Sequence, residues 1–94
     1  ANRLLVMYVL ENGLEKNRFG ISVSKKVGNS VVRHRVTRLI REAYRLNKDC
    51  ICSGYDIVFV ARVTAKDKGY HEIESAMMHL FRLKKLTIVR DGEN

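Results

Sequence analysis

The stretch that decides the fold is SKKVGNSVVRHRVTRLIREAYR, residues 24–45. Gly28, Asn29 and Ser30 predict a helix N-terminus, because a short side-chain oxygen can accept a hydrogen bond from an unpaired N–H of the first turn. The helix is predicted to continue to about Lys48. At about 100° per residue, one arc collects apolar side chains and the opposite arc collects cations. The apolar arc holds Val32, Val36, Leu39, Ile40, Ala43 and Tyr44. The cationic arc holds His34, Arg38, Arg41 and Arg45.

Positive charge is concentrated in this helix. The 94 residues hold 18 Lys and Arg against 10 Asp and Glu, a formal net charge of +8. Residues 25–48 contain eight of the basic residues and one acid, Glu42, so this segment carries +7 and the other 70 residues carry +1. Like charges three or four residues apart destabilise an isolated helix by about 0.2–0.5 kcal/mol per pair. The arrangement therefore predicts a polyanionic partner that offsets this repulsion.

The type of cation narrows the class of partner. Five of the charges on the helix are arginines, whose planar fork binds phosphate oxygens in pairs and can lie against a base. Nucleic acid is therefore the predicted partner. RNA is favoured over DNA, because the chain has no helix-turn-helix or paired zinc ligands and a single basic helix suits an irregular RNA surface. A structural module resembling a ribosomal protein and a DNA-binding regulator remain as alternatives.

The segments before the helix predict two paired strands. Residues 3–10 are apolar on both faces, which predicts a strand that is covered on both sides or nearly so. Residues 18–26 alternate between apolar and small or polar side chains, the pattern of a strand with one buried face. Asn12-Gly13 is a strong turn signal between them. An antiparallel pair is the simplest interpretation.

The segments after the helix complete one α+β domain, predicted to span residues 1–94. Residues 55–62 form a third strand, and their apolar character on both faces predicts a central position in the sheet. Residues 71–85 repeat apolar side chains with the spacing of an amphipathic helix. Residues 86–94 are a short strand or a tail. The order ββαβα predicts a single sheet of about four strands with the arginine-rich helix and a C-terminal amphipathic helix packed against it.

A second candidate surface lies on the predicted sheet. Gly20, Ser22 and Ser24 are small where a covered sheet normally carries Val or Ile, and the alternation places Tyr8 on the same side. An exposed ring beside small residues would let single-stranded nucleotides stack, at about 1–3 kcal/mol per base. The alternative is that this face packs beneath another element and needs small residues for fit.

The sequence carries no recognisable catalytic constellation. His34 lies among arginines and is interpreted as a contact residue, while His71 and His79 are interpreted as surface residues of the last helix. No pair of carboxylates has a spacing suited to acid–base or two-metal chemistry. Cys50 and Cys52 are too close for an ordinary disulfide and predict free thiols of a cytoplasmic protein. No membrane-length apolar run or leader occurs, and the missing initial Met suggests a trimmed N-terminus.

The helix and its preceding turn resemble a family signature. SVSKKVGNSVVRHRVTRLIREAYR, residues 22–45, is similar to the pattern S-x-x-K-K-x-G-N-A-V-x-R-N-R-x-K-R-x-x-R of the protein subunit of bacterial ribonuclease P. The paired strands before it, DIVFVAR after it and the closing helix HEIESAMMHLFR follow the order of that family, so the resemblance covers essentially the whole chain.

This resemblance implies a cytoplasmic ribonucleoprotein that removes the 5′ leader from precursor tRNA. In that family the RNA subunit carries the metal-dependent hydrolysis, so the protein is not catalytic alone. Mg²⁺ is expected to be held mainly by the RNA, with no ion bound tightly by the protein. The expected partners are ribonuclease P RNA and precursor tRNA, with no membrane. The family fold implies a left-handed βαβ crossover of the ribosomal protein S5 domain 2-like kind.

Residue roles follow from the resemblance position by position. The residues expected to contact the catalytic RNA, and metal ions held between the two, are Lys25, Lys26, Asn29, Arg33, Arg35, Arg38 and Arg41, to which the cationic arc adds His34 and Arg45. The residues expected on the leader-binding side are Tyr8, Ser22 and Ser24.

Three departures from the family pattern are visible. His34 replaces a usual Asn, which puts a titratable ring where the family has an amide. Thr37 replaces a usual Lys, which removes one phosphate-binding cation and keeps a hydroxyl. The family begins with a short helix whose aromatic residues form one wall of the leader cleft, and the given residues start after it. If that helix is absent, leader binding is expected to be weakened while binding to the RNA subunit survives.

Overall fold

The helix predicted after Asn29 forms as α1, Ser30–Asn47, in a computed structural model that describes residues 2–88. Asn29 is its N-cap, and the side-chain Oδ1 accepts a hydrogen bond from the Val32 N–H at 3.0 Å. Position 28 must be glycine because Val32 lies too close for a side chain: a Cβ at this position would be 2.8 Å from Cβ of Val32. The start of α1 is therefore set by two neighbouring residues, one that caps the helix and one that leaves space for it.

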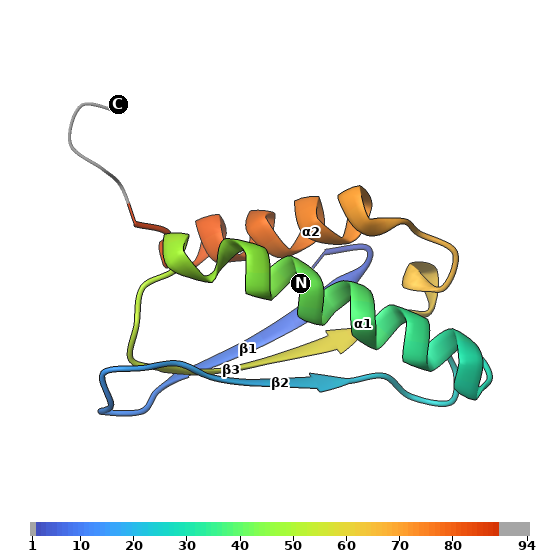
Figure 1. Ribbon diagram of the computed structural model, residues 1–94, viewed down its shortest axis with the longest axis horizontal. Helices are drawn as coiled ribbons and strands as arrows, with labels where there is room; N and C mark the ends of the chain where they lie inside the picture. Colours follow the sequence, from blue (N-terminus) through green and yellow to red (C-terminus); the bar gives the residue numbers. More distant parts are fainter. Residues whose placement is uncertain (1, 89–94) are drawn as a thin grey trace.

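The remaining elements confirm the predicted order ββαβα (Figure 1). Strands β1, Leu5–Glu11, and β2, Arg18–Ser22, precede α1, and β3, Tyr55–Ala61, follows it. Helix α2 spans Tyr70–Leu83. Two single-turn 3₁₀ helices also occur, η1 at Lys48–Cys50 and η2 at Val63–Ala65. No helix within residues 2–88 is long and apolar enough to cross a membrane.

The strand pairing differs from the prediction. The sheet order is β1-β3-β2, so β3 is central as predicted, but β1 and β2 do not pair with each other. β1 is antiparallel to β3, and β2 is parallel to β3. Parallel neighbours need a long crossover connection, and α1 provides it between β2 and β3. The predicted antiparallel pair of β1 and β2 is therefore wrong.

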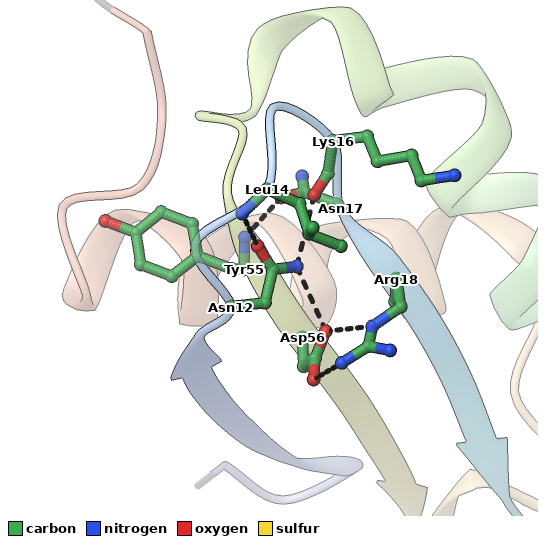
Figure 2. Close-up of polar contacts among 7 residues, drawn as sticks. All are labelled: Asn12, Leu14, Lys16, Asn17, Arg18, Tyr55 and Asp56. Atoms are coloured by element: carbon green, nitrogen blue, oxygen red, sulfur yellow. Dashed lines mark hydrogen bonds and ion pairs between the residues drawn. The ribbon is translucent and has the colours of Figure 1, made fainter.

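Asn12-Gly13 does form a turn, but the strand that follows it does not pair with β1. Gly13 has a φ of 70°, in the left-handed region that glycine adopts readily. The Asn12 side chain accepts a hydrogen bond from the Leu14 N–H (Figure 2). The Asn12 backbone N–H donates to the Gly54 carbonyl at 2.9 Å. These bonds hold the connection against the start of β3. The chain thus crosses the end of the central strand and enters the sheet on its other side.

The apolar core lies on one face of the sheet, beneath both helices (Figure 1). Phe59 of β3 makes a T-shaped contact with Phe81 of α2 at 5.5 Å between centroids and a tilted contact with Phe19 of β2 at 5.8 Å. Phe19 in turn stacks on Tyr44 of α1 at 4.0 Å. The chain of rings joins both helices to the sheet.

The opposite face of the sheet is not covered by the described residues. On β1, Tyr8 is 62% exposed and Leu10 is 70% exposed. The expectation that residues 3–10 are covered on both sides is therefore wrong. The reason is that both helices bury their apolar arcs against the same side of the sheet, so only Leu5 and Met7 of β1 are buried.

The ends of two elements also differ from the prediction. β2 stops at Ser22, because the chain turns at Ser24, whose carbonyl accepts from the Val27 N–H at 3.1 Å. The described sheet has three strands rather than about four. In the predicted C-terminal strand, only an isolated bridge between Thr87 and Ile51 forms, and residues 89–94 lie outside the described residues.

Gly28, just before α1, and Gly20, within β2, allow a matched stability test. Gly28→Ala is expected to lower the free energy of unfolding by about 1–3 kcal/mol, because the added methyl overpacks against Val32. Gly20→Ala is the control, since a Cβ there meets only Val58 at an ordinary 3.7 Å, and it should leave stability unchanged or raise it by up to about 1 kcal/mol. Urea unfolding measures both, and an equal effect of the two changes would contradict the steric account of the helix start.

A polar clamp joins the end of α1 to the start of α2. Glu74 accepts hydrogen bonds from the Asn47 amide and from the Tyr70 hydroxyl, each at 2.8 Å. The Asn47 bond, followed by the Tyr70 bond, lowers the pKa of Glu74 below its ordinary value. Burial and the neighbouring carboxylate raise the pKa of Tyr70 to about 12. The clamp is therefore formed with Glu74 ionised and Tyr70 neutral.

The clamp predicts an acid-sensitive share of stability. Because the pKa of Glu74 is lower in the folded state, its contribution is present above the ordinary carboxyl value of 4.5 and is lost as the pH falls through the folded value. Glu74→Gln keeps the acceptor but does not titrate, so its stability should fall less than that of the parent chain below pH 4.5. Denaturant unfolding at pH 6 and pH 3 measures this, and parallel losses would contradict it.

Candidate nucleic-acid interface

The outward face of α1 presents the predicted cations. His34, Arg38, Arg41 and Arg45 are exposed, on the side opposite the buried Val36, Ile40 and Ala43. Within residues 2–88, the first three of these cationic-arc residues make no salt bridge. They form the α1 face, defined here as His34, Arg38 and Arg41. The repulsion between the positive charges of Arg38 and Arg41 is thus not offset by a carboxylate within residues 2–88.

Arg45 differs from the α1 face because it is paired. Its guanidinium forms a salt bridge with the Glu42 carboxylate, one turn earlier on the same helix. This hydrogen bond lowers the pKa of Glu42 and raises that of Arg45. Arg45 was predicted to contact RNA, and in this structure its charge is offset by the single acid of the helix.

Two arginines flank the α1 face on either side. Arg35 donates to the backbone carbonyls of Lys66 at 3.3 Å and Lys68 at 2.8 Å, so it ties α1 to the segment before α2. Arg33 is partly buried, and its Nε is a buried donor without a hydrogen-bond partner in the described structure. Thr37 donates to the Arg33 carbonyl at 2.8 Å, so its hydroxyl is used within the helix.

The turn before α1 extends the cationic surface. Lys25 and Lys26 are exposed, and the buried Val27 beside them anchors the turn to the core. Asn29 is exposed, but its side-chain oxygen is engaged as the helix cap. The nine residues predicted to bind RNA therefore lie on one helix and the turn that precedes it, but Asn29, Arg35 and Arg45 also have contacts within the protein.

The open sheet face is the second surface, defined by three rows of side chains across the strands. The register aligns Tyr8, Val58 and Gly20 in one row and Val6, Val60 and Ser22 in the next. Tyr8 and Ser22 are exposed, and Ser24 is exposed just beyond β2. The prediction that Tyr8 shares a face with the small residues is confirmed for Gly20 and Ser22. The alternative, that this face lies beneath another element, does not hold within residues 2–88.

The third row contains an ion pair that the sequence reasoning missed. It aligns Leu10, Asp56 and Arg18. Nε and Nη2 of Arg18 each donate to one oxygen of Asp56 at 2.7 Å, and the Asn12 amide donates to the same carboxylate at 3.0 Å (Figure 2). These bonds, that of Arg18 first, lower the pKa of Asp56. The pair could not be found without the parallel register, because 38 residues separate its members.

Residues 2–88 contain no group of three or more His, Cys, Asp or Glu side chains that could hold a metal ion. His71 and His79 are exposed on α2, as predicted for surface residues, and Cys50 and Cys52 are free thiols. The geometry supports binding of an anion along α1 and contact with a flat ligand on the open sheet face.

Comparison with known proteins identifies the family. Residues 1–85 match the family model described as Ribonuclease P. The chain belongs to the ribonuclease P protein family. Family membership makes it a subunit of an endoribonuclease that acts in tRNA processing. This agrees with the resemblance carried by the signature around α1.

Individual relatives support the assignment over most of their length. The chain is 65% identical over 86 residues to the ribonuclease P protein component of Lachnoclostridium phytofermentans, covering 92% of this chain and 74% of the relative. Among solved structures, the RNase P protein of Staphylococcus aureus matches with a TM-score of 0.83 and 38% identity, covering 94% of this chain and 81% of that one. The RNase P protein of Thermotoga maritima matches with a TM-score of 0.82 and 28% identity, over 88% and 79% of the two chains.

The Glu42–Arg45 pair generates a prediction about affinity. Glu42→Gln should release Arg45 and tighten binding to ribonuclease P RNA, with the slope of log affinity against log salt concentration steeper by about 0.7–0.9. Glu72→Gln is the matched control, because it changes the net charge equally but lies on α2, where Glu72 faces Lys68 at 3.9 Å. Filter binding at several salt concentrations measures both, and equal effects would mean that net charge matters rather than its position on α1.

Proposed function

We propose that this chain binds ribonuclease P RNA along α1 and the 5′ leader of precursor tRNA on the open sheet face, and so promotes removal of the leader. The observation that carries the proposal is the separation of two surfaces by the core, one strongly cationic and one uncharged at its centre with an exposed aromatic ring. One subunit can then hold two RNA segments at once. The chemistry of cleavage belongs to the RNA subunit in this account.

Binding of the catalytic RNA is supported by charge and by hydrogen-bonding capacity. Arg38 and Arg41 of the α1 face, with Lys25 and Lys26, offer cations without a salt bridge among the described residues, along one helix and its preceding turn. Arginine forks suit an irregular RNA backbone, because each can contact two phosphate oxygens.

Binding of the leader is supported by the shape of the open sheet face. Tyr8 offers an exposed ring on which a base can stack. Gly20 and Ser22 on the same face have no side chain or a short one, so they do not block a ligand from approaching the sheet. Arg62 is exposed and directly follows β3, so a cation lies at one edge of this face. A single strand can therefore place its bases on the sheet and a phosphate near this cation.

As the family resemblance implies, Mg²⁺ is expected to be held mainly by the RNA. Mg²⁺ supplies the metal-dependent hydrolysis of the holoenzyme when it is bound by the RNA. The arginines of this chain would neutralise phosphates and thereby lower the Mg²⁺ concentration that RNA folding and cleavage require.

Cleavage of precursor tRNA by ribonuclease P RNA at low Mg²⁺, with and without this chain, tests the proposal. The parent chain should stimulate cleavage. The combined change of Arg38 and Arg41 to Ala should weaken RNA binding and reduce the salt slope by about 0.7–0.9 for each phosphate that is no longer neutralised. Arg82→Ala removes one exposed cation from α2 and is the control.

Two outcomes would contradict the proposal in different ways. Unchanged affinity and salt slope after removal of the Arg38 and Arg41 side chains would show that the α1 face does not bind the RNA. Tight RNA binding by the parent chain without any stimulation of cleavage would instead indicate a purely structural RNA-binding module.

A further inference from the structure

Two flat side chains stand apart on the open sheet face with smaller residues between them, and the surface between them is called the trough here. Tyr8 lies on β1, and Arg18 lies on β2, with β3 between them. Gly20 and Val58 are aligned with Tyr8, and Asp56 is aligned with Arg18 in the adjacent row of the same face. The surface between the ring and the guanidinium is therefore formed by Asp56, Val58 and the backbone of Gly20.

The fold does not require glycine at the floor of this trough. A Cβ added to Gly20 would meet only Cγ2 of Val58, at 3.7 Å, which is ordinary van der Waals contact. The backbone of Gly20 is also outside the left-handed region. Glycine inside a strand costs about 0.5–1 kcal/mol relative to Ala. Packing within the protein therefore does not explain the glycine at position 20. Space for a ligand to approach the backbone does explain it.

The planar guanidinium of Arg18 is fixed in one orientation by hydrogen bonds. Its two hydrogen bonds to Asp56 are bidentate, and the Asn12 amide donates to the same Oδ1 that accepts from Nε of Arg18 (Figure 2). The side chain of Arg18 is still 64% exposed, against 31% for Asp56. The ion pair offsets the charge of Arg18, but the plane of the guanidinium remains available for stacking on a base.

The two flat groups are too far apart to serve one base. Neighbouring strands are about 4.8 Å apart and residues on one face repeat every 6.6–6.8 Å, so two strand spacings and one repeat separate Tyr8 from Arg18 by about 12 Å. Each group must therefore contact a different base. A single-stranded segment that crosses the trough satisfies both.

We propose that Tyr8 and Arg18 are two separate stacking platforms for bases of the single-stranded leader, and that Gly20 keeps the floor between them clear. This inference rests on the proposed function, in which the leader occupies the open sheet face. It adds a second base-binding position, at the end of the face where β2 begins. Duplex RNA does not fit this arrangement, because its bases are already stacked on one another.

Affinity of the reconstituted holoenzyme for precursor tRNA, with a long leader and with a one-nucleotide leader, tests the inference. Arg18→Lys keeps the charge but removes the plane, and it should weaken binding of the long leader by about fivefold or more. The salt slope should not change, and the short leader should bind as before. If Arg18→Lys binds the long leader like the parent chain, Arg18 is not a platform. If Arg18→Ala lowers the salt slope while Arg18→Lys has no effect, Arg18 contacts phosphate and the inference is overturned.

Gly20→Val provides a second, independent variant. It should fill the trough and weaken binding of the long leader without lowering thermal stability, whereas normal leader binding by this variant would overturn the inference.

Leaders with single abasic positions, bound by the parent chain, should show two separate positions of weakened binding. A single sensitive position would leave only one platform and would also overturn it.

Tyr8→Ala separates this inference from the proposed function. If Tyr8→Ala weakens binding of the long leader but Arg18→Lys and Gly20→Val do not, the leader lies on this face and only the second platform is wrong. If none of the three variants changes the advantage of the long leader, the leader is not bound on the open sheet face, and the proposed function fails with the inference. Melting temperature and affinity for ribonuclease P RNA alone control for loss of folding.

Discussion

Phe59 packs between Phe19 and Phe81, and this contact through the central strand is the interaction on which the rest of the structure depends. It connects the parallel neighbour β2 on one side with helix α2 above the sheet. Through Phe19 it reaches Tyr44 and so fixes α1 as well. Because all of these rings lie on one face of the sheet, both helices must lie there too. The other face is left to contact a ligand.

One-sided packing also separates the charges. Helix α1 turns its apolar arc to the core and its arginines away from the sheet, so the cationic surface and the open sheet face point in different directions. On the open face, Arg18 is offset by Asp56, while the α1 face has no such partner within the described residues. In the proposed function, a large folded RNA meets the first surface and a single strand meets the second.

Local features of the fold could be predicted from the sequence, because they depend on residues that are close in the chain. The Asn29 cap, the apolar arcs of the two helices and the central position of β3 belong to this class. The pairing of β1 with β2 was predicted wrongly for the same reason. Asn12-Gly13 specifies a local reversal, but whether the next strand returns beside β1 or crosses the end of β3 depends on Gly54 and Asn17, which act at long range.

In the candidate site, too, features that depend on nearby residues could be predicted and long-range contacts could not. Periodicity placed Arg38 and Arg41 on an exposed face and Tyr8 with Ser22, since both inferences need only the repeat of a helix or a strand. The contacts of Arg35 with the segment before α2, and of Arg18 with Asp56, join residues more than 30 positions apart. Their partners become identifiable only once the crossover and the parallel register are known.

Site-specific cross-linking in the assembled holoenzyme tests most directly whether the two surfaces hold different RNAs. A benzophenone would be attached to Ser22→Cys or to Arg38→Cys in a chain whose Cys50 and Cys52 are serine, with precursor tRNA bound. The account predicts that the probe at position 22 cross-links to the leader and that the probe at position 38 cross-links to ribonuclease P RNA. Cross-links from both positions to the same RNA segment would contradict it.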